Sequence, residues 1–166
     1  SSPSRGLGDV YKRQRYSRHI MLPEIDIEGQ ISISSSKIAV VGLGGLGCSA
    51  SVYLAASGVG ELNLIDNDLI DLSNLQRQIL FSEADLNKKK VDTAKIKLSS
   101  LNENIKVNSS NLRLNKSNIR KILEGSEIVL DCTDNFETRK VINAYCLNEK
   151  KILILSLIHI SEPTRR

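Results

Sequence analysis

The sequence predicts an α/β fold in which a mostly parallel sheet is covered by helices on both faces. Two observations lead to this expectation. Short apolar runs rich in Ile, Leu and Val alternate along the chain with segments of helical period. A glycine-rich turn joins the first of these runs to the first helix. Strands that alternate with helices form parallel sheets through right-handed crossovers.

The first half of the core contains two strands and two helices. Strand 38–42 is the run Ile-Ala-Val-Val followed by glycine, and helix 45–57 is rich in small residues. Strand 61–66 is a second apolar run that ends on an aspartate. In helix 88–101, four apolar residues recur at three- and four-residue steps and form one apolar face: Val91, Ala94, Leu98 and Leu101.

The second half continues the alternation with five elements. A short strand near 105–109 precedes helix 117–124, for which Ser117 is the expected N-cap. Strand 127–131, helix 136–148 and strand 151–155 complete the series. We expect the sheet to be unfinished at its C-terminal side, because the alternation stops at this last strand.

The turn Gly42-Leu43-Gly44-Gly45-Leu46-Gly47 has the spacing of a dinucleotide-binding motif. Its first glycine makes the tight turn, the second lets the backbone approach phosphate, and the third lets the helix pack on the strand. Free N–H groups and the helix dipole then hold the anion. Because the turn follows a predicted strand and opens a predicted helix, we expect a Rossmann-like, doubly wound fold that binds a nucleotide. The alternative is a turn that is merely rich in glycine.

Two residues beyond the turn indicate the kind of nucleotide. Asp66 ends the second apolar run, 19 residues after Gly47, and would accept hydrogen bonds from ribose hydroxyls. The alternative for Asp66 is a solvated turn aspartate beside Asn67 and Asp68. Arg77 follows eleven residues later. This arginine favours ATP over NAD as the ligand.

Composition and charge restrict the class of protein. The 166 residues suit one domain, and 40% hydrophobic and 25% charged residues are ordinary for a globular protein. The net charge of +4 comes mostly from the two ends, and residues 15–156 carry only about +1. We therefore expect no nucleic-acid partner. The run Lys88-Lys89-Lys90 is more typical of a solvated helix face than of a binding patch, although Lys90 is considered separately below.

Cysteine usage and the absence of apolar spans predict a cytoplasmic protein with no membrane contact. Cys48, Cys132 and Cys146 have no CxxC spacing and are expected to be buried free thiols in a reducing compartment. Cys48 lies in the first turn of a helix, where the dipole could lower the pKa of its thiol, but small packing residues are common at such positions. The sequence contains no signal peptide and no run of transmembrane length.

The two ends do not fit the alternation. Residues 1–14 and 157–166 show neither a helical nor a strand period and resemble translated sequencing-adaptor sequence. We expect them to be non-native tails. On this interpretation, residues 15–156 are the N-terminal part of a longer protein.

Several motifs occur in one order: Arg15-Tyr16-Ser17-Arg18, the glycine turn, Ser73 through Gln78, Lys90, and Asp131-Cys132-Thr133-Asp134-Asn135. In this order they resemble the ThiF/MoeB adenylyltransferases (the HesA/MoeB/ThiF family), bacterial relatives of ubiquitin-activating enzymes. The resemblance covers about residues 15–156 and implies that they form the N-terminal part of an ATP-binding adenylyltransferase domain. It implies ATP-dependent adenylylation of the C-terminal glycine carboxylate of a ubiquitin-like sulfur-carrier protein, as in thiamine or molybdopterin cofactor biosynthesis, with release of pyrophosphate.

The resemblance also implies roles for individual residues. The glycines Gly42, Gly44, Gly45 and Gly47 would contact the nucleotide, Asp66 would hold the ribose, and Ser73, Asn74, Leu75, Gln76, Arg77, Lys90 and Asn135 would complete the ATP site. Asn74, Arg77 and Lys90 would bind phosphates, and Asp134 would bind Mg²⁺. Asp131 is more typical of a structural residue, but the sequence leaves the reverse assignment open. Arg77, Asp134 and Arg18 would be catalytic, and Arg18 would reach across the interface of a homodimer.

Independent chemistry agrees with the resemblance. The attacking carboxylate has a pKa of roughly 3.5 and needs no general base at neutral pH. A chain with only two histidines suits such a reaction. Two alternatives remain: a non-catalytic nucleotide-binding subunit of the same fold, and an NAD-dependent oxidoreductase. Zinc motifs, which many family members carry, are expected only in a C-terminal part that this chain lacks.

Overall fold

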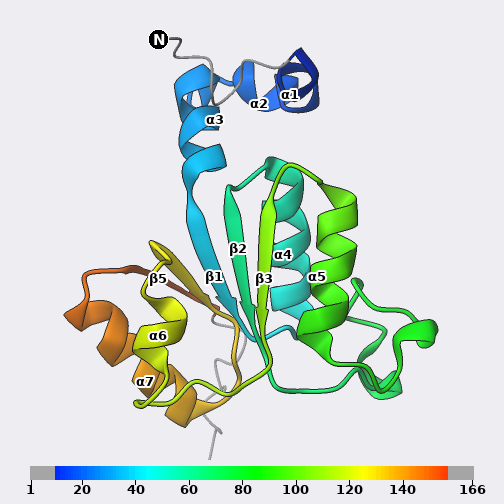
Figure 1. Cartoon of the computed structure of the whole chain (residues 1–166), viewed down its shortest axis with the longest axis vertical. Helices are drawn as coiled ribbons and strands as arrows, with labels where there is room; N and C mark the ends of the chain where they lie inside the picture. The colour runs from blue at the N-terminus through cyan, green and yellow to red at the C-terminus, as the bar shows by residue number, and fades with distance from the viewer. Residues whose placement is uncertain (1–9, 157–166) are drawn as a thin grey trace, which may run out of the picture.

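The computed structural model describes residues 10–156 and contains one five-stranded sheet in that range (Figure 1). All strand pairs are parallel and the order is β3-β2-β1-β4-β5. The strands are β1 (Lys37–Val41), β2 (Glu61–Ile65), β3 (Lys106–Ser110), β4 (Ile128–Asp131) and β5 (Ile152–Leu155). This order is that of a doubly wound nucleotide-binding fold. The predicted fold class is confirmed.

Helices cover both faces of the sheet, as predicted. On one face lie α4 (Gly45–Ser57) and α5 (Lys90–Leu101), and on the other lie α6 (Ile119–Leu123) and α7 (Phe136–Asn148) (Figure 1). Two separate apolar clusters fill the spaces between sheet and helices. The central strand β1 contributes Ile38 and Val40 to the first cluster and Ala39 and Val41 to the second. Burial on both faces explains why this strand is a continuous apolar run.

Most predicted boundaries agree with the structure to within two residues. One predicted detail is wrong at the start of α6: the N-cap residue is Asn118 and not Ser117. Asn115 instead organises the turn that leads into the helix. Its Oδ1 accepts hydrogen bonds from the N–H groups of Ser117 and Asn118, at 2.8 and 3.0 Å. This Asx turn holds the two residues before α6, and the helix itself has no side-chain N-cap hydrogen bond.

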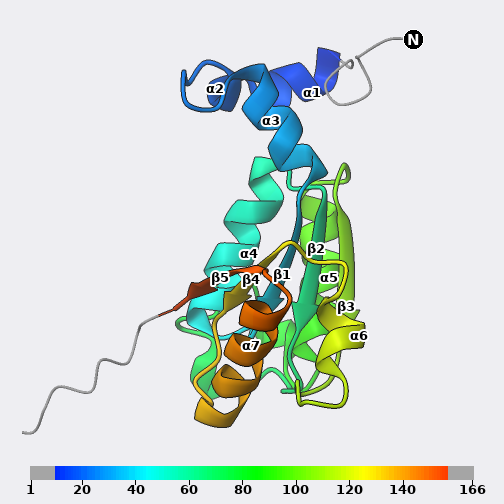
Figure 2. The same ribbon diagram turned by 90° about the vertical axis from the view of Figure 1, so that its left-hand side faces the viewer.

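The sequence patterns did not predict the N-terminal arm formed by α1 (Val10–Arg15), α2 (Ser17–Ile20) and α3 (Asp26–Ser35). Figures 1 and 2 show the arm beyond the amino-terminal ends of the strands. Residues 10–14 are thus helical, although their sequence shows neither a helical nor a strand period. Residues 1–9 and 157–166 lie outside the described range, and their origin stays a prediction. Within residues 10–156, no helix is both long and apolar enough to span a membrane.

Buried polar side chains fasten the arm to the sheet domain. Asn102 is fully buried after α5, and its Nδ2 donates to the hydroxyl of Tyr16 at 2.9 Å and to the carbonyl of Ala55 at 2.8 Å. Gln30 of α3 is also fully buried and donates to the carbonyl of Ser57 at 2.9 Å. Both contacts lie at the C-terminal end of α4. The arm is thus attached to the same helix whose other end opens the site described below.

We predict that Asn102→Ala lowers the free energy of unfolding by about 1–3 kcal/mol, because it leaves a buried hydroxyl and a buried carbonyl without a donor. Urea unfolding followed by circular dichroism measures the change. Asn104→Ala is the matched control, since only the backbone N–H of Asn104 contacts Asn102. Equal midpoints for the two variants would contradict the anchoring role of Asn102.

Candidate functional site

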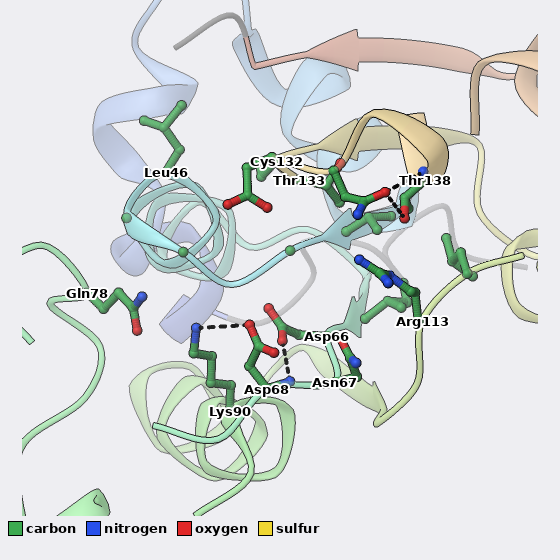
Figure 3. A pocket seen from close by; sticks show the side chains of 18 of the residues that line it. Leu46, Asp66, Asn67, Asp68, Gln78, Lys90, Arg113, Cys132, Thr133 and Thr138 are labelled. Atoms are coloured by element: carbon green, nitrogen blue, oxygen red, sulfur yellow. Dashed lines mark hydrogen bonds and ion pairs between the residues drawn. The ribbon is translucent and has the colours of Figure 1, made fainter. Parts of the chain in front are cut away.

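A cavity of about 550 Å³ opens at the carboxyl ends of the strands (Figure 3). It lies where β1 adjoins both β2 and β4, which is the point at which the strand order reverses. Open α/β sheets bind ligands at such a switch point. The residues that line it come from the glycine turn, the ends of β2 and β3, the segment 74–78, the start of α5 and the loop after β4.

The glycine turn brings α4 directly against the end of β1. Gly42 has a φ of +92°, which favours glycine, and a Cβ there would meet the carbonyl oxygen of Cys132 at 2.8 Å. A Cβ on Gly47 would collide with the carbonyl of Gly42, so the first turn of the helix can pack this closely only without a side chain. By contrast, a Cβ on Gly44 would meet no atom within 4 Å, and Gly44 lines the cavity.

The N-terminus of α4 faces the cavity. Gly44 is its N-cap and provides no side-chain acceptor, while Gly45 and Leu46 of the first turn line the cavity. The first N–H groups of a helix have no partner within the helix, and the dipole makes this end positive. This end of the cavity therefore suits an anion.

Asp66 is bound to the glycine turn and is not a freely solvated turn residue. Its Oδ2 accepts from the N–H of Leu43 at 2.7 Å, and its Oδ1 accepts from the N–H of Asp68 at 2.7 Å. The side chain is half-buried and lines the cavity. Each carboxylate oxygen retains a second lone pair, so the group can still accept hydrogen bonds from hydroxyls of a ligand.

Cationic and amide side chains gather on one side of the glycine turn. Arg77 is exposed, and its guanidinium donates to Oδ1 of Asn74 at 2.9 Å. The side chain of Lys90 is only 6% exposed, and its Nζ lies 3.8 Å from Oδ2 of Asp68. Lys88 and Lys89 are exposed and do not line the cavity, as expected for a solvated run. Lys90 is therefore the lysine of this run that reaches the site.

The loop after β4 holds two aspartates, for which the sequence favoured Asp134 as the ligand but left the reverse assignment open. Asp131 is fully buried, and its Oδ1 accepts from the N–H and the hydroxyl of Thr133 at 3.0 and 2.7 Å. Asp134 is exposed and lines the cavity. Asn135 also lines the cavity, and its Oδ1 caps α7 by accepting from the N–H of Thr138 at 2.9 Å. Asp134, and not Asp131, is positioned to meet a ligand.

Some of the predicted site residues do not line the cavity. Ser73, Leu75, Gln76 and Gly47 are absent from its walls. Ser73 instead donates two hydrogen bonds to Asp71, which lower the pKa of that carboxyl. Arg18 lies on α2, at the opposite end of the sheet from the cavity (Figure 1). The roles predicted for these residues stay predictions.

The structure adds lining residues to which the sequence analysis gave no role. Asp68, Gln78, Arg113 and Thr133 all line the cavity. Asp68, Arg113 and Thr133 each follow the carboxyl end of a strand by two or three residues. That position was a usable signal, because the carboxyl ends of parallel strands meet at one edge. Gln78 carried no such signal.

The thiols at the site are not nucleophiles near neutral pH. Cys132 lines the cavity, and burial raises the pKa of its thiol to about 11. Burial raises the pKa of Cys48 to about 12, so the lowering by the helix dipole considered above is wrong. Because a thiolate is the reactive form, both groups stay protonated and inert at pH 7. Cys48, Cys132 and Cys146 are free, as predicted.

Three comparisons relate the chain to known proteins. The model of the ThiF family matches residues 16–159. A molybdopterin-synthase adenylyltransferase from Haemophilus influenzae is 47% identical over 142 residues, covering 86% of this chain and 58% of that protein. The adenylyltransferase and sulfurtransferase MOCS3 from Culex quinquefasciatus is 44% identical over 140 residues, covering 84% of this chain and 32% of that protein.

A solved structure shares the architecture. The crystal structure of E. coli tRNA N6-threonylcarbamoyladenosine dehydratase, TcdA, in complex with ATP matches with a TM-score of 0.83 and 25% identity. The match covers 89% of this chain and 59% of that one. The chain thus spans less than two thirds of the length of the relatives named here.

We predict that Gly47→Ala lowers the free energy of unfolding by about 1–3 kcal/mol, because the added methyl group collides with the carbonyl of Gly42 and overpacks the turn. Gly44→Ala is the control, since its methyl group enters open space. Thermal unfolding of both variants measures the difference. If Gly47→Ala unfolds at the temperature of Gly44→Ala, the close packing of α4 against β1 is not required.

Proposed function

The chain belongs to the ThiF family, as its motifs predicted, and we propose that it forms the ATP-binding part of an adenylyltransferase. The substrate of the longer protein would be the C-terminal glycine carboxylate of a ubiquitin-like sulfur-carrier protein, and pyrophosphate would be released. One observation carries this proposal: a single cavity joins the open N-terminus of α4, the carboxylate of Asp66, the cations Arg77 and Lys90, and the carboxylate of Asp134.

The relatives support the choice of reaction and of nucleotide. Two of them bear the name adenylyltransferase, at 47% and 44% identity. The structural relative TcdA has been crystallised in complex with ATP. The name of the Haemophilus protein refers to molybdopterin synthase, which favours the molybdopterin branch over the thiamine branch for this chain.

The cavity fits ATP from the base to the phosphates. Leu112, Leu114 and Arg113 line the part beyond β3, where apolar walls and a planar guanidinium suit a base. Asp66 lies at the end of β2 and can accept from ribose hydroxyls. The helix N-terminus would then hold the α-phosphate, while Arg77 and Lys90 would neutralise the phosphates beyond it.

The reaction needs charge neutralisation and alignment more than acid–base catalysis. A carboxylate oxygen of the glycine attacks the α-phosphorus and forms a new P–O bond. The bond between that phosphorus and the bridging oxygen breaks, and pyrophosphate leaves with the electron pair. Both reactants are anionic, so the cations and N–H groups of the site lower the barrier by holding them together. The protonated thiol of Cys132 takes no part.

Mg²⁺ is the metal that this donor set fits. Asp134 and Asp68 both line the cavity and offer carboxylate oxygens, and Mg²⁺ in nucleotide sites is held by one or two carboxylates together with phosphates. We propose Asp134 as its ligand, where the ion would neutralise phosphate charge. Within the described residues, no three His, Cys, Asp or Glu side chains form a metal cluster.

Further parts of the proposal concern the assembly and the compartment. A homodimer would allow Arg18 of one subunit to reach the phosphates bound by the other. We also propose a cytoplasmic location, without nucleic-acid or membrane partners. Zinc is proposed only for the part of the longer protein that follows this chain.

Two other functions fit the same fold less well. An NAD-dependent oxidoreductase has no evident use for Arg77, Lys90 and Asp134 at one cavity. A non-catalytic nucleotide-binding subunit would not need these residues either, and this chain has all three at the cavity. The binding of ATP and of NAD distinguishes the oxidoreductase, and exchange of pyrophosphate into ATP by the longer protein distinguishes the non-catalytic subunit.

We predict that the chain binds Mg·ATP but not NAD in titration calorimetry. Arg77→Ala should raise the dissociation constant of ATP by roughly 10- to 100-fold, because a charged hydrogen bond to phosphate is lost. Lys121→Ala is the control, since Lys121 is exposed on α6 and does not line the cavity. Binding of NAD with equal or greater affinity would refute the adenylyltransferase proposal.

We also predict that Asp134→Asn removes the dependence of ATP affinity on Mg²⁺. In the absence of Mg²⁺ the variant should bind ATP at least as tightly as the wild type, because one negative charge facing the phosphates is gone. Glu103→Gln, an exposed acid beyond the cavity, controls for net charge. Titrations with and without Mg²⁺ test this, and a Mg²⁺ effect that survives in Asp134→Asn would assign the metal to another residue.

A further inference from the structure

Arg139 of α7 joins two segments at the carboxyl edge of the sheet. Its Nε and Nη2 donate to the carbonyl of Thr133 at 2.9 and 2.6 Å, and Nη2 also donates to the carbonyl of Ser156 at 2.9 Å. Thr133 belongs to the loop after β4, and Ser156 directly follows β5. One half-buried guanidinium therefore ties together the chain beyond two neighbouring strands.

An ion pair does not explain this position of the arginine. Within residues 10–156, Arg139 takes part in no salt bridge, and its side-chain hydrogen bonds all go to backbone carbonyls. Arginine stays charged and presents its N–H donors in a rigid, planar fork. The side chain is therefore suited to hold two carbonyls in one fixed geometry.

The carbonyl of Thr133 belongs to the peptide group that leads into Asp134. Because a peptide group is planar, a donor that holds its oxygen orients the whole unit up to the next Cα. The N–H and hydroxyl of Thr133 are held separately by Asp131. On the other side, Asn135 is fixed to α7 by its hydrogen bond from the N–H of Thr138. The backbone of Asp134 is thus held from both directions.

The carboxylate of Asp134 has no such support of its own. The residue is exposed at the cavity, and within the described part of the chain no hydrogen bond or ion pair holds its side chain. The place of this carboxylate therefore depends on the backbone that carries it. Arg139 holds the carbonyl immediately before that residue.

We propose that Arg139 is a positioning residue for Asp134. It keeps the backbone of Asp134 in the orientation that presents the carboxylate to the cavity, and through Ser156 it braces this loop against the end of β5. The inference rests on the proposed function, in which Asp134 binds Mg²⁺. Removal of a residue that supports a metal ligand typically lowers metal affinity by roughly 10- to 100-fold.

The test compares Arg139→Met with the wild type in titrations with ATP, with and without Mg²⁺. Methionine keeps much of the length of the side chain but has no N–H donor. The gain in ATP affinity that Mg²⁺ brings should fall by roughly tenfold, or disappear if it is smaller than that. The affinity for ATP without Mg²⁺ should stay within about twofold, because Arg139 does not line the cavity.

Lys140→Met is the matched control. Lys140 is the next residue on α7, is exposed, and contacts Glu137 and the ring of Phe136 instead of the loop. Its replacement removes the same charge and should leave the effect of Mg²⁺ unchanged. Arg139→Lys should give an intermediate effect of Mg²⁺, since an ammonium can still donate to a carbonyl but has no planar fork.

The effect of Mg²⁺ separates positioning from a purely structural role. Loss of the contacts to two carbonyls should lower the urea midpoint of the ligand-free protein in either case. A purely structural arginine would lower the midpoint and leave the gain from Mg²⁺ intact in the folded variant. Should Arg139→Met fail to fold, Arg139→Lys provides the same comparison of ATP affinity with and without Mg²⁺.

The possible failures are distinguishable. If the wild type binds no ATP, the proposed function and this inference are both refuted. If ATP binds without any effect of Mg²⁺, the metal role of Asp134 and the positioning role of Arg139 are refuted, while the nucleotide site stands. A full Mg²⁺ effect in folded Arg139→Met refutes the positioning role alone. Equal losses with and without Mg²⁺ would show that Arg139 supports the nucleotide site as a whole and would also overturn the proposal.

Discussion

The packing of α4 against the end of β1 is the contact on which the site depends. The first turn of the helix lies so close to the carbonyl of Gly42 that Gly47 can carry no side chain. This closeness directs the free N–H groups of α4 into the cavity. It also brings the N–H of Leu43 within 2.7 Å of Asp66. One steric constraint therefore positions both the phosphate end and the ribose end of the proposed nucleotide.

Local geometry explains which parts of the fold the sequence could predict. Helix 45–57 was predicted with the bounds that it has in the structure, because a glycine turn and a left-handed cap at Gly58 mark both ends. The arm was missed because its helices carry no apolar stripe, and in α3 the one buried residue is Gln30. A buried glutamine that contacts a carbonyl 27 residues away has no signature in a local pattern.

The same limit applies to the site. The sequence identified Asp66, Arg77, Lys90 and Asp134, which line the cavity, because they follow strands or belong to a known motif. It favoured Asp134 over Asp131 as the metal ligand but left the reverse assignment open, since both flank one turn. The choice depends on Thr133, whose N–H and hydroxyl bind Asp131 and leave Asp134 to the cavity. The environment of Gln78 is likewise a property of the folded chain.

The position of the arm constrains any catalytic role for Arg18. The arm lies at the amino ends of the strands and the cavity at their carboxyl ends (Figures 1 and 2). Five residues of β1 separate the two ends, a length of about 16 Å. The sheet and its helices fill that distance, so Arg18 cannot contact phosphates bound to its own chain. The role proposed for Arg18 therefore requires a second protomer, whereas those proposed for Arg77, Lys90 and Asp134 are complete within one.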